Sequence, residues 1–289
     1  MRIAVTGTTG RVGAALVKHF SAQHEVISLP RSACDLADGK SVAAALDQLA
    51  CDVLLNPAGI TSLEDCEDDE ARAMRVNEAA PAEMADWAAK RGVPMFHFST
   101  DYVFNSDVPR LFREDDAPEP VSVYGRSKFA GERAVLARTG NCVIRISWVY
   151  GPEKPSFVDR IFDDALAGKP LAAIADKFSL PVLTTDLADW VGRMITQKTT
   201  GIIHACHSGE PISWHDLAVA VVEEMAVLGI LSGAPPVQRQ KLAEMTTFRA
   251  ARPRHSAMAT DRLTKILGHP PRHWRDALED YVRQRGLLR

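Results

Sequence analysis

The chain begins MRIAVTGTTGRVG (residues 1–13), and this stretch decides the fold. Its run IAVT is apolar on both faces, which is typical of a strand inside a parallel sheet. The glycines follow the spacing G-x-x-G-x-x-G from Gly7, and an amphipathic stretch at Val12–Ser21 predicts a helix directly after them. Glycine lets the backbone approach a pyrophosphate closely, and a helix N-terminus favours the anion. We therefore predict a dinucleotide-binding turn; the alternative is a turn whose glycines serve only helix–strand packing.

Strands and helices alternate along the rest of the chain. Further strands are expected at Glu25–Leu29, Asp52–Asn56, Pro94–Ser99, Cys142–Trp148, Leu171–Ala175 and Gly201–Ala205, and helices near Lys40–Leu49, Ala71–Arg91, Tyr124–Arg138, Phe157–Ala167, Thr185–Gln197, Trp214–Leu228 and Trp274–Arg285. This order predicts an α/β fold with a Rossmann-type, doubly wound parallel sheet. Residues 1–150 are expected to form the NAD(P)-binding domain, to which residues 184–206 return. Residues 151–183 and 207–289 are expected to form a smaller C-terminal lobe that binds substrate.

Composition narrows the class of protein. The chain has 289 residues with 46% hydrophobic and 25% charged side chains, as in ordinary globular proteins. A net charge of -3 gives no basic footprint for nucleic acid, so small-molecule partners are expected. The opening residues run straight into a strand, which predicts no signal peptide, no membrane anchor and a cytoplasmic location. The five cysteines are scattered singly, so they indicate neither a disulfide framework nor a thiolate zinc site.

The end of the second strand bears on which nicotinamide cofactor would fit. An acidic residue there would bind the ribose hydroxyl, whereas a basic residue would accept a 2′-phosphate. The strand ends Leu29-Pro30-Arg31-Ser32, with Arg31 and no acid, which favours NADPH and leaves NADH as the alternative. Arg31 is otherwise a solvated surface cation. Asp35 is a candidate acceptor for the adenine amino group, or alternatively the N-cap of the next helix.

A tyrosine and a lysine stand where proton transfer would need them. Tyr124 and Lys128 are four residues apart, so on a helix they share one face. A ketone reduced by hydride needs a proton, and a neighbouring cation is expected to lower the pKa of the tyrosine. Thr100 follows the apolar strand ending at Phe98, at the carboxyl edge of the sheet where ligands bind, and is the candidate to polarise the carbonyl. The alternatives are an ordinary helix face and a turn.

Several motifs together resemble a known family. Four segments, TGTTGRVG (6–13), STDYVF (99–104), VYGRSKFAGE (123–132) and SWVYG (147–151), resemble the extended short-chain dehydrogenase/reductase superfamily, and within it the dTDP-4-dehydrorhamnose reductases. The resemblance implies a catalytic Thr100, Tyr124 and Lys128, a substrate site with Thr100, Asp101 and Trp148, and a cofactor site with Gly7, Thr9, Gly10, Arg11, Val12, Gly13, Arg31, Asp35, Leu36, Ala58, Gly59, Tyr124 and Lys128. It implies NADPH-dependent reduction of a keto group on a nucleotide-linked deoxysugar.

The chain also departs from that pattern where substrate would be read. It has Asp176-Lys177-Phe178-Ser179-Leu180-Pro181-Val182 in place of the usual Asp-Gln-x-Gly-x-Pro-Thr. His255 replaces the usual Asn after Arg-Pro-x, and Glu64-Asp65 replaces an Asp-Lys pair. A second hypothesis is therefore reduction of another sugar nucleotide or carbonyl compound. A third is a non-catalytic NADP-binding subunit, because the chain also resembles the regulatory subunit of methionine adenosyltransferase.

Metal binding is not expected. The acidic run 64–70 is typical of a helix N-terminus or a solvated face, and His204, His207 and His215 are spaced irregularly. Some members of the resembled family use magnesium at a dimer contact, which leaves a homodimer open.

Overall fold

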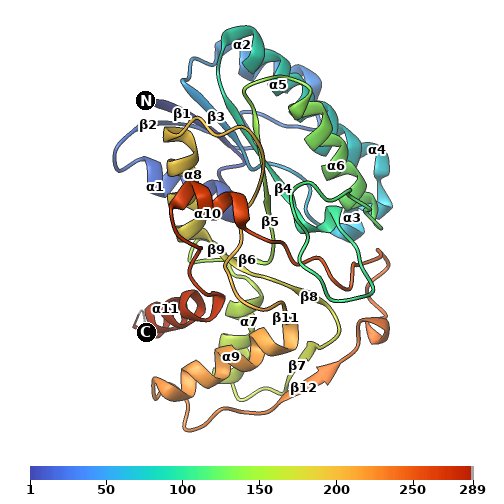
Figure 1. Ribbon diagram of the computed structural model, residues 1–289, viewed down its shortest axis with the longest axis vertical. Coiled ribbons are helices and arrows are strands. Elements are labelled where there is room, and N and C mark those ends of the chain that lie inside the picture. The colour runs from blue at the N-terminus through green and yellow to red at the C-terminus, as the bar shows by residue number, and fades with distance from the viewer. Residues whose placement is uncertain (288–289) are drawn as a thin grey trace.

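A parallel sheet of six strands runs through the larger part of the molecule, as the computed structural model shows for residues 1–287 (Figure 1). The strands are β1 (Arg2–Thr6), β2 (Glu25–Leu29), β3 (Val53–Asn56), β4 (Met95–Thr100), β5 (Cys142–Ile146) and β10 (Gly201–His204), in the order β10-β5-β4-β3-β1-β2. β1 lies inside, with Ala4 paired to Ile27 on one side and to Leu54 on the other. The predicted Rossmann-type fold is confirmed.

Alternate residues of these strands face two helical layers, because side chains alternate across a strand. Ile3, Val5 and Leu55 belong to the hydrophobic core shared with α1 (Arg11–Phe20), α8 (Thr184–Thr196) and α10 (Asp261–Leu267). Ala4, Leu54 and Val143 belong to the core on the opposite face, with α2 (Gly39–Gln48), α5 (Ala80–Arg91) and α6 (Val123–Leu136). Strands apolar on both faces are thus covered on both faces.

The long helix predicted at Ala71–Arg91 is interrupted. The structure has α3 (Leu63–Asp68), α4 (Glu70–Met74), a π-helical turn η1 (Arg75–Ala79) and then α5. Pro81 stands in the first turn of α5 and has no N–H to donate to the carbonyl of Asn77, four residues earlier, which is a physical reason for the wider turn. Asn77 lies within this π-helical turn, and its side chain is next to the site described below.

The strand predicted at Cys142–Trp148 ends at Ile146. Trp148 has a φ of 44°, which no regular strand residue adopts. Pairing resumes in β6 (Val149–Tyr150), which runs parallel to β9 (Val182–Leu183). The backbone between β5 and β6 therefore turns sharply at Trp148, at the carboxyl end of the sheet.

A smaller lobe follows, built on three helices. Its helices are α7 (Phe157–Leu166), α9 (Trp214–Val227) and α11 (Trp274–Leu287). Its short strands are β7 (Leu171–Ile174), β8 (Phe178–Ser179), β11 (Ile212–Ser213) and β12 (Val237–Gln240), and a 3-10 turn, η3 (Leu242–Glu244), follows β12. A second 3-10 turn, η2 (Asp101–Val103), directly follows β4 of the main sheet. β10 lies in the main sheet, and α10 packs against β10 and α8. We propose that α10 goes with the larger lobe, unlike the rest of 207–289.

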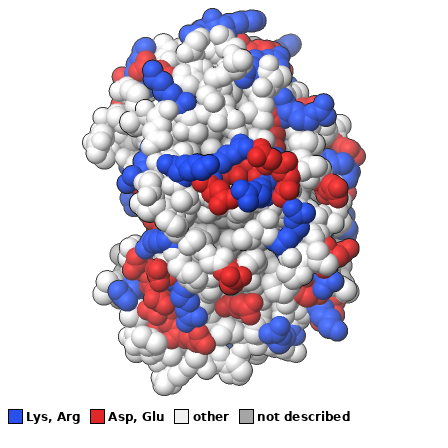
Figure 2. All heavy atoms as spheres, viewed as in Figure 1, with Lys and Arg blue, Asp and Glu red and all other residues white. Residues whose placement is uncertain are grey.

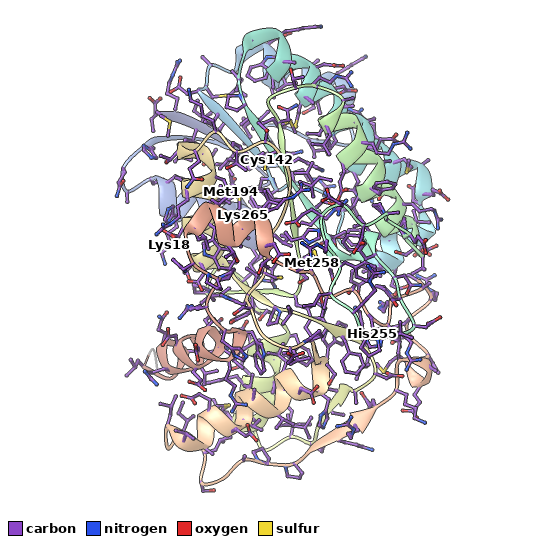
Figure 3. All side chains as sticks on the ribbon, viewed as in Figure 1. Lys18, Cys142, Met194, His255, Met258 and Lys265 are labelled. Atoms are coloured by element: carbon purple, nitrogen blue, oxygen red, sulfur yellow. The ribbon has the colours of Figure 1, made fainter. Side chains whose placement is uncertain are left out.

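Charges of both signs are mixed on the visible surface (Figure 2), and the cysteines are unpaired. Figure 2 shows acidic and basic side chains interspersed over the visible face. All five cysteines are free and buried, and Cys142 lies inside the sheet (Figure 3). Among residues 1–287, no helix is both long and apolar enough to cross a membrane.

Candidate active site

The candidate residues converge on one cavity at the carboxyl edge of the sheet. The cavity measures about 640 Å³. Its lining includes all the residues nominated from the sequence, namely Gly7, Thr9, Gly10, Arg11, Val12, Gly13, Arg31, Asp35, Leu36, Ala58, Gly59, Thr100, Asp101, Tyr124, Lys128 and Trp148. The turn after β1 and the loops after β3, β4 and β5 supply most of them, since the carboxyl ends of parallel strands meet at one edge.

The glycine turn has the geometry of an anion cradle. Gly7 has a φ of 56°, and its carbonyl accepts a hydrogen bond from the N–H of Gly10 at 2.8 Å. The first N–H groups of a helix have no partner within the helix. At α1 no side chain caps them either. Free N–H groups at a helix N-terminus suit a pyrophosphate, and the turn therefore fits the dinucleotide that its spacing predicts.

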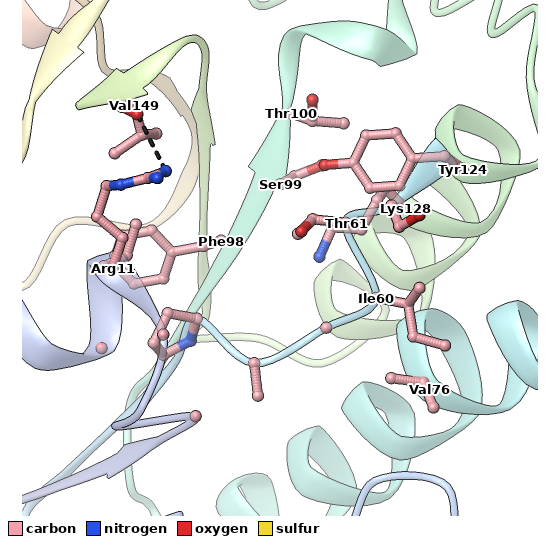
Figure 4. A pocket seen from close by; sticks show the side chains of 18 of the residues that line it. Arg11, Ile60, Thr61, Val76, Phe98, Ser99, Thr100, Tyr124, Lys128 and Val149 are labelled. Atoms are coloured by element: carbon pink, nitrogen blue, oxygen red, sulfur yellow. Dashed lines mark hydrogen bonds between the residues drawn. The ribbon is translucent and has the colours of Figure 1, made fainter. Parts of the chain in front are cut away.

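Arg11 joins this turn to the loop after β6. Its guanidinium donates to the carbonyl oxygen of Val149 at 3.1 Å (Figure 4) and to that of Pro155 at 2.6 Å. The guanidinium of Arg11 is therefore engaged with backbone carbonyls. The groups that Arg11 could still offer a bound cofactor are its backbone N–H and its surface in the cavity wall.

The far end of the cavity holds the residues that would read the adenosine half. Arg31 lies just after β2, with a side chain 64% exposed and its Nε 3.6 Å from Asp35 Oδ1. Asp35 also accepts from the N–H of Ala37 at 3.0 Å. The N-cap of α2 is Asp38, which accepts from the N–H of Lys40 at 2.9 Å, so the capping alternative for Asp35 is wrong.

Thr100 and Tyr124 meet in the middle of the cavity. Thr100 ends β4, and Tyr124 lies in the first turn of α6, whose N-cap Ser122 accepts from the N–H of Gly125 at 3.1 Å. Figure 4 shows the Tyr124 ring directed toward the end of β4. Burial raises the pKa of Tyr124 above its ordinary value, and a hydrogen bond with Thr100 only partly opposes this. The predicted lowering of the pKa of Tyr124 is therefore wrong for this structure.

Lys128 lies one turn further along α6 and belongs to a buried polar chain. Its Nζ is 3.4 Å from His97 Nε2, and His97 Nδ1 is 3.1 Å from Asn56 Nδ2. Asn56 Oδ1 accepts from the hydroxyl of Thr6 at 2.6 Å, at the start of the glycine turn. Burial lowers the pKa of Lys128 to about 8. This series of contacts thus connects Lys128 to the glycine turn across three strands.

Two of the residues that support this site were not predicted. His97 is a buried polar residue within the apolar run MFHF, and that anomaly is a signal the sequence offers. Asn77 accepts from the N–H of Ile60 at 2.9 Å and donates to the hydroxyl of Ser127 at 3.0 Å. It ties the loop after β3 to α6, a contact that nothing in the sequence near Asn77 indicates.

A known family accounts for this arrangement. Residues 1–286 match the model of a family described as RmlD substrate binding domain. The chain belongs to this family. A dTDP-4-dehydrorhamnose reductase of Sinorhizobium fredii is 33% identical, with 98% of this chain and 97% of that protein covered. The spore coat polysaccharide biosynthesis protein SpsK of Bacillus subtilis is 32% identical, with 98% of each chain covered.

Solved structures agree with the RmlD family assignment at the level of the fold. A dTDP-4-dehydrorhamnose reductase of Bacillus anthracis, solved in complex with NADP, superposes with a TM-score of 0.89 at 22% identity over 98% of this chain and 99% of that one. A dTDP-4-dehydrorhamnose reductase of Yersinia enterocolitica gives a TM-score of 0.88 at 26% identity, with 98% of each chain covered.

The acidic segment that distinguishes this chain from the usual RmlD pattern binds arginines of the C-terminal loop. Glu64 accepts from Arg252 Nη2 at 2.7 Å and from the N–H of Ala250 at 3.0 Å. Asp68 forms a two-pronged ion pair with Arg249 at 2.8 and 2.7 Å. These contacts hold α3 against the loop that carries His255. Across the described 287 residues, no group of three or more His, Cys, Asp or Glu side chains is arranged to hold a metal ion.

Proposed function

We propose that the chain reduces a keto group on a nucleotide-linked deoxysugar, with NADPH as the favoured cofactor and NADH as the alternative. The observation that carries this function is the meeting of Thr100, Tyr124 and Lys128 in the same cavity as the glycine turn. Membership of a family whose relatives are named reductases supports it.

The residues divide the chemistry between them. When bound, the reduced nicotinamide supplies a hydride to the carbonyl carbon. Tyr124 donates its phenolic proton to the carbonyl oxygen as that oxygen gains the electron pair of the broken C=O π bond. Thr100 hydrogen-bonds the same oxygen, and the Lys128 ammonium stabilises the phenolate that remains. The glycine turn and the first N–H groups of α1 would hold the pyrophosphate, and Asp101 and Trp148 would contact the sugar.

A panel of substrates tests this function directly. Purified protein should oxidise NADPH with at least one dTDP-linked 4-keto-6-deoxysugar, and the reaction should stop when the keto sugar is replaced by its 4-hydroxy form. Absence of NADPH consumption across dTDP-, UDP- and GDP-linked keto sugars would rule out the proposed function. A protein that binds NADPH without turnover and co-purifies with a stoichiometric enzyme would favour the regulatory alternative.

Arg31 should set the cofactor preference. An exposed guanidinium at the end of β2 can pair with a 2′-phosphate, and such a charge-assisted contact is worth about tenfold in binding. In Arg31→Ala we expect the ratio of kcat/KM with NADPH to that with NADH to fall about tenfold. Arg2→Ala is the matched control, because Arg2 is also an exposed, ion-paired arginine but its chain position opens β1 at the opposite edge of the sheet. An unchanged ratio in Arg31→Ala would leave the preference to other residues.

We also place the reaction in the cytoplasm. Five free, buried thiols suit a reducing compartment. The only binding partner that this proposal requires, apart from the cofactor, is the sugar-nucleotide substrate.

A further inference from the structure

Lys177 is a fully buried lysine that the reductase mechanism does not use. Its side chain has 0% exposure, and across residues 1–287 its Nζ has no hydrogen-bond partner. Burying an ammonium without hydrogen bonds is costly, and lysine is almost never found this way without compensation. It stands just before β8, at the position where the resembled pattern has Gln.

Two aromatic rings of the cavity wall provide the compensation. Lys177 Nζ lies 4.6 Å from the centroid of the Tyr102 ring and 5.5 Å from that of Trp148. Both rings line the active-site cavity, whereas Lys177 lies behind the lining. A cation against aromatic faces is attracted most strongly when it is desolvated, as it is here. The ammonium therefore holds two walls of the cavity from behind.

The same ammonium faces Asp101, the acidic residue of that wall. Asp101 accepts hydrogen bonds from Ser179 at 2.9 Å and from Ser256 at 2.6 Å. Burial raises the pKa of Asp101, and the charge of Lys177 is the strongest effect opposing this rise. Lys177 and Asp101 therefore partly balance each other's charge at this wall of the cavity.

Trp148 is the residue that most needs such support. Its φ of 44° is strained for a bulky side chain, and strain of this kind persists only where the surroundings hold it. The indole Nε1 is buried without a hydrogen-bond partner within the described chain. The Trp148 ring also contacts that of Trp214, with centroids 5.7 Å apart. Because Nε1 is buried while Trp148 as a whole is partly exposed and lines the cavity, the part of Trp148 that faces the cavity is not its N–H, and its strained position depends on these surroundings.

The backbone around Lys177 is fixed from both sides. Asp176 accepts from the N–H of Leu242 at 2.7 Å, and the N–H of Phe178 donates to the carbonyl of Arg254 at 2.6 Å. The Phe178 ring stacks on His255, with centroids 4.8 Å apart, and Figure 3 places His255 beside β8. The position of the ammonium is thus determined before any ligand arrives.

We propose that Lys177 is a positioning residue for substrate: it clamps Tyr102 and Trp148 so that the part of Trp148 that lines the cavity is held in place against the sugar. The inference rests on the proposed function and deepens it by naming the residue that fixes this wall of the sugar site.

Steady-state kinetics with a dTDP-linked 4-keto-6-deoxysugar test the coupling. Lys177→Met keeps the length of the side chain and removes the charge, and we expect it to raise KM about thirtyfold, the worth of a desolvated cation–π contact. Trp148→Phe replaces the indole by a smaller ring, and the double variant should raise KM little beyond the larger single effect, because the two residues act as one unit. The Kd for NADPH should stay within about twofold throughout. Lys169→Met is the matched control, an exposed lysine of the same lobe that pairs with Asp164.

A second readout needs no substrate. The near-ultraviolet circular dichroism of Trp148, obtained as the difference between wild type and Trp148→Phe, should largely disappear in Lys177→Met. If KM effects multiply in the double variant, or the Trp148 signal persists, Lys177 does not act through Trp148 and the proposal fails. If Lys177→Met does not fold, Lys177→Gln provides the same two measurements. A wild type without turnover refutes the proposed function alone, and the spectroscopic result still decides the role of Lys177.

Discussion

Replacement of Tyr124 by phenylalanine should lower kcat about thousandfold, within the range that positioned proton transfer contributes. Tyr124 is buried, and burial keeps its pKa above the ordinary value, so the phenol carries the proton that the reduced carbonyl oxygen needs. Phenylalanine removes only that hydroxyl. The ring keeps its edge contact with Tyr102, whose centroid lies 5.7 Å away. Single-turnover measurement of NADPH oxidation would report the chemical step directly.

The same variant should bind NADPH with a Kd within about twofold of wild type, because uniform binding and transition-state stabilisation are separable. Tyr150→Phe is the matched control. Tyr150 is as deeply buried, and its hydroxyl has no hydrogen-bond partner in the described chain, so its removal should leave kcat unchanged. Undiminished turnover in Tyr124→Phe would mean that another group donates the proton.

Much of the larger lobe could be predicted because its strands are buried on both faces. β1 and β3 are continuous apolar runs, and β1 is followed by α1, whose Leu16 and Phe20 belong to the same core. Strands of two residues, such as β8 and β9, have no periodicity to detect and exist only because other segments pair with them. Nothing local to the chain could have predicted them. The π-helical turn at Arg75–Ala79 was equally hidden, although Pro81 is a visible cause.

The site was predictable to the extent that it follows strand ends. Thr100 ends a strand and the glycine turn directly follows one, so their meeting follows from the parallel sheet. Contacts between distant segments were not predictable. Asn77 reaches Ile60 and Ser127 across separations that no spacing rule covers, and a lysine in a loop gives no sign that it is fully buried. Burial, more than residue type, distinguishes Lys177 from a surface cation.

Gly13→Ala should weaken NADPH binding about tenfold to a hundredfold, because the substitution forces the turn apart. A Cβ at Gly13 would lie 2.3 Å from the carbonyl oxygen of Gly7 and 2.8 Å from its carbonyl carbon. Both are backbone atoms of the turn that would receive the pyrophosphate, so they cannot move aside without disturbing it. Overpacking of this kind costs about 1–3 kcal/mol, which corresponds to the stated loss of affinity.

The effect of an added Cβ depends on which glycine is replaced, and Gly233 provides the comparison. A Cβ at Gly233 would meet nothing within 4 Å, and its φ lies outside the left-handed region, so Gly233→Ala should leave both the Kd for NADPH and Tm unchanged. Gly13→Ala should raise that Kd while KM for the sugar at saturating NADPH changes little, since the atoms nearest the added Cβ belong to Gly7 and Thr8 and not to Asp101 or Trp148. Equal NADPH affinity in the two variants would show that the glycine turn serves helix–strand packing only, the alternative that its spacing left open.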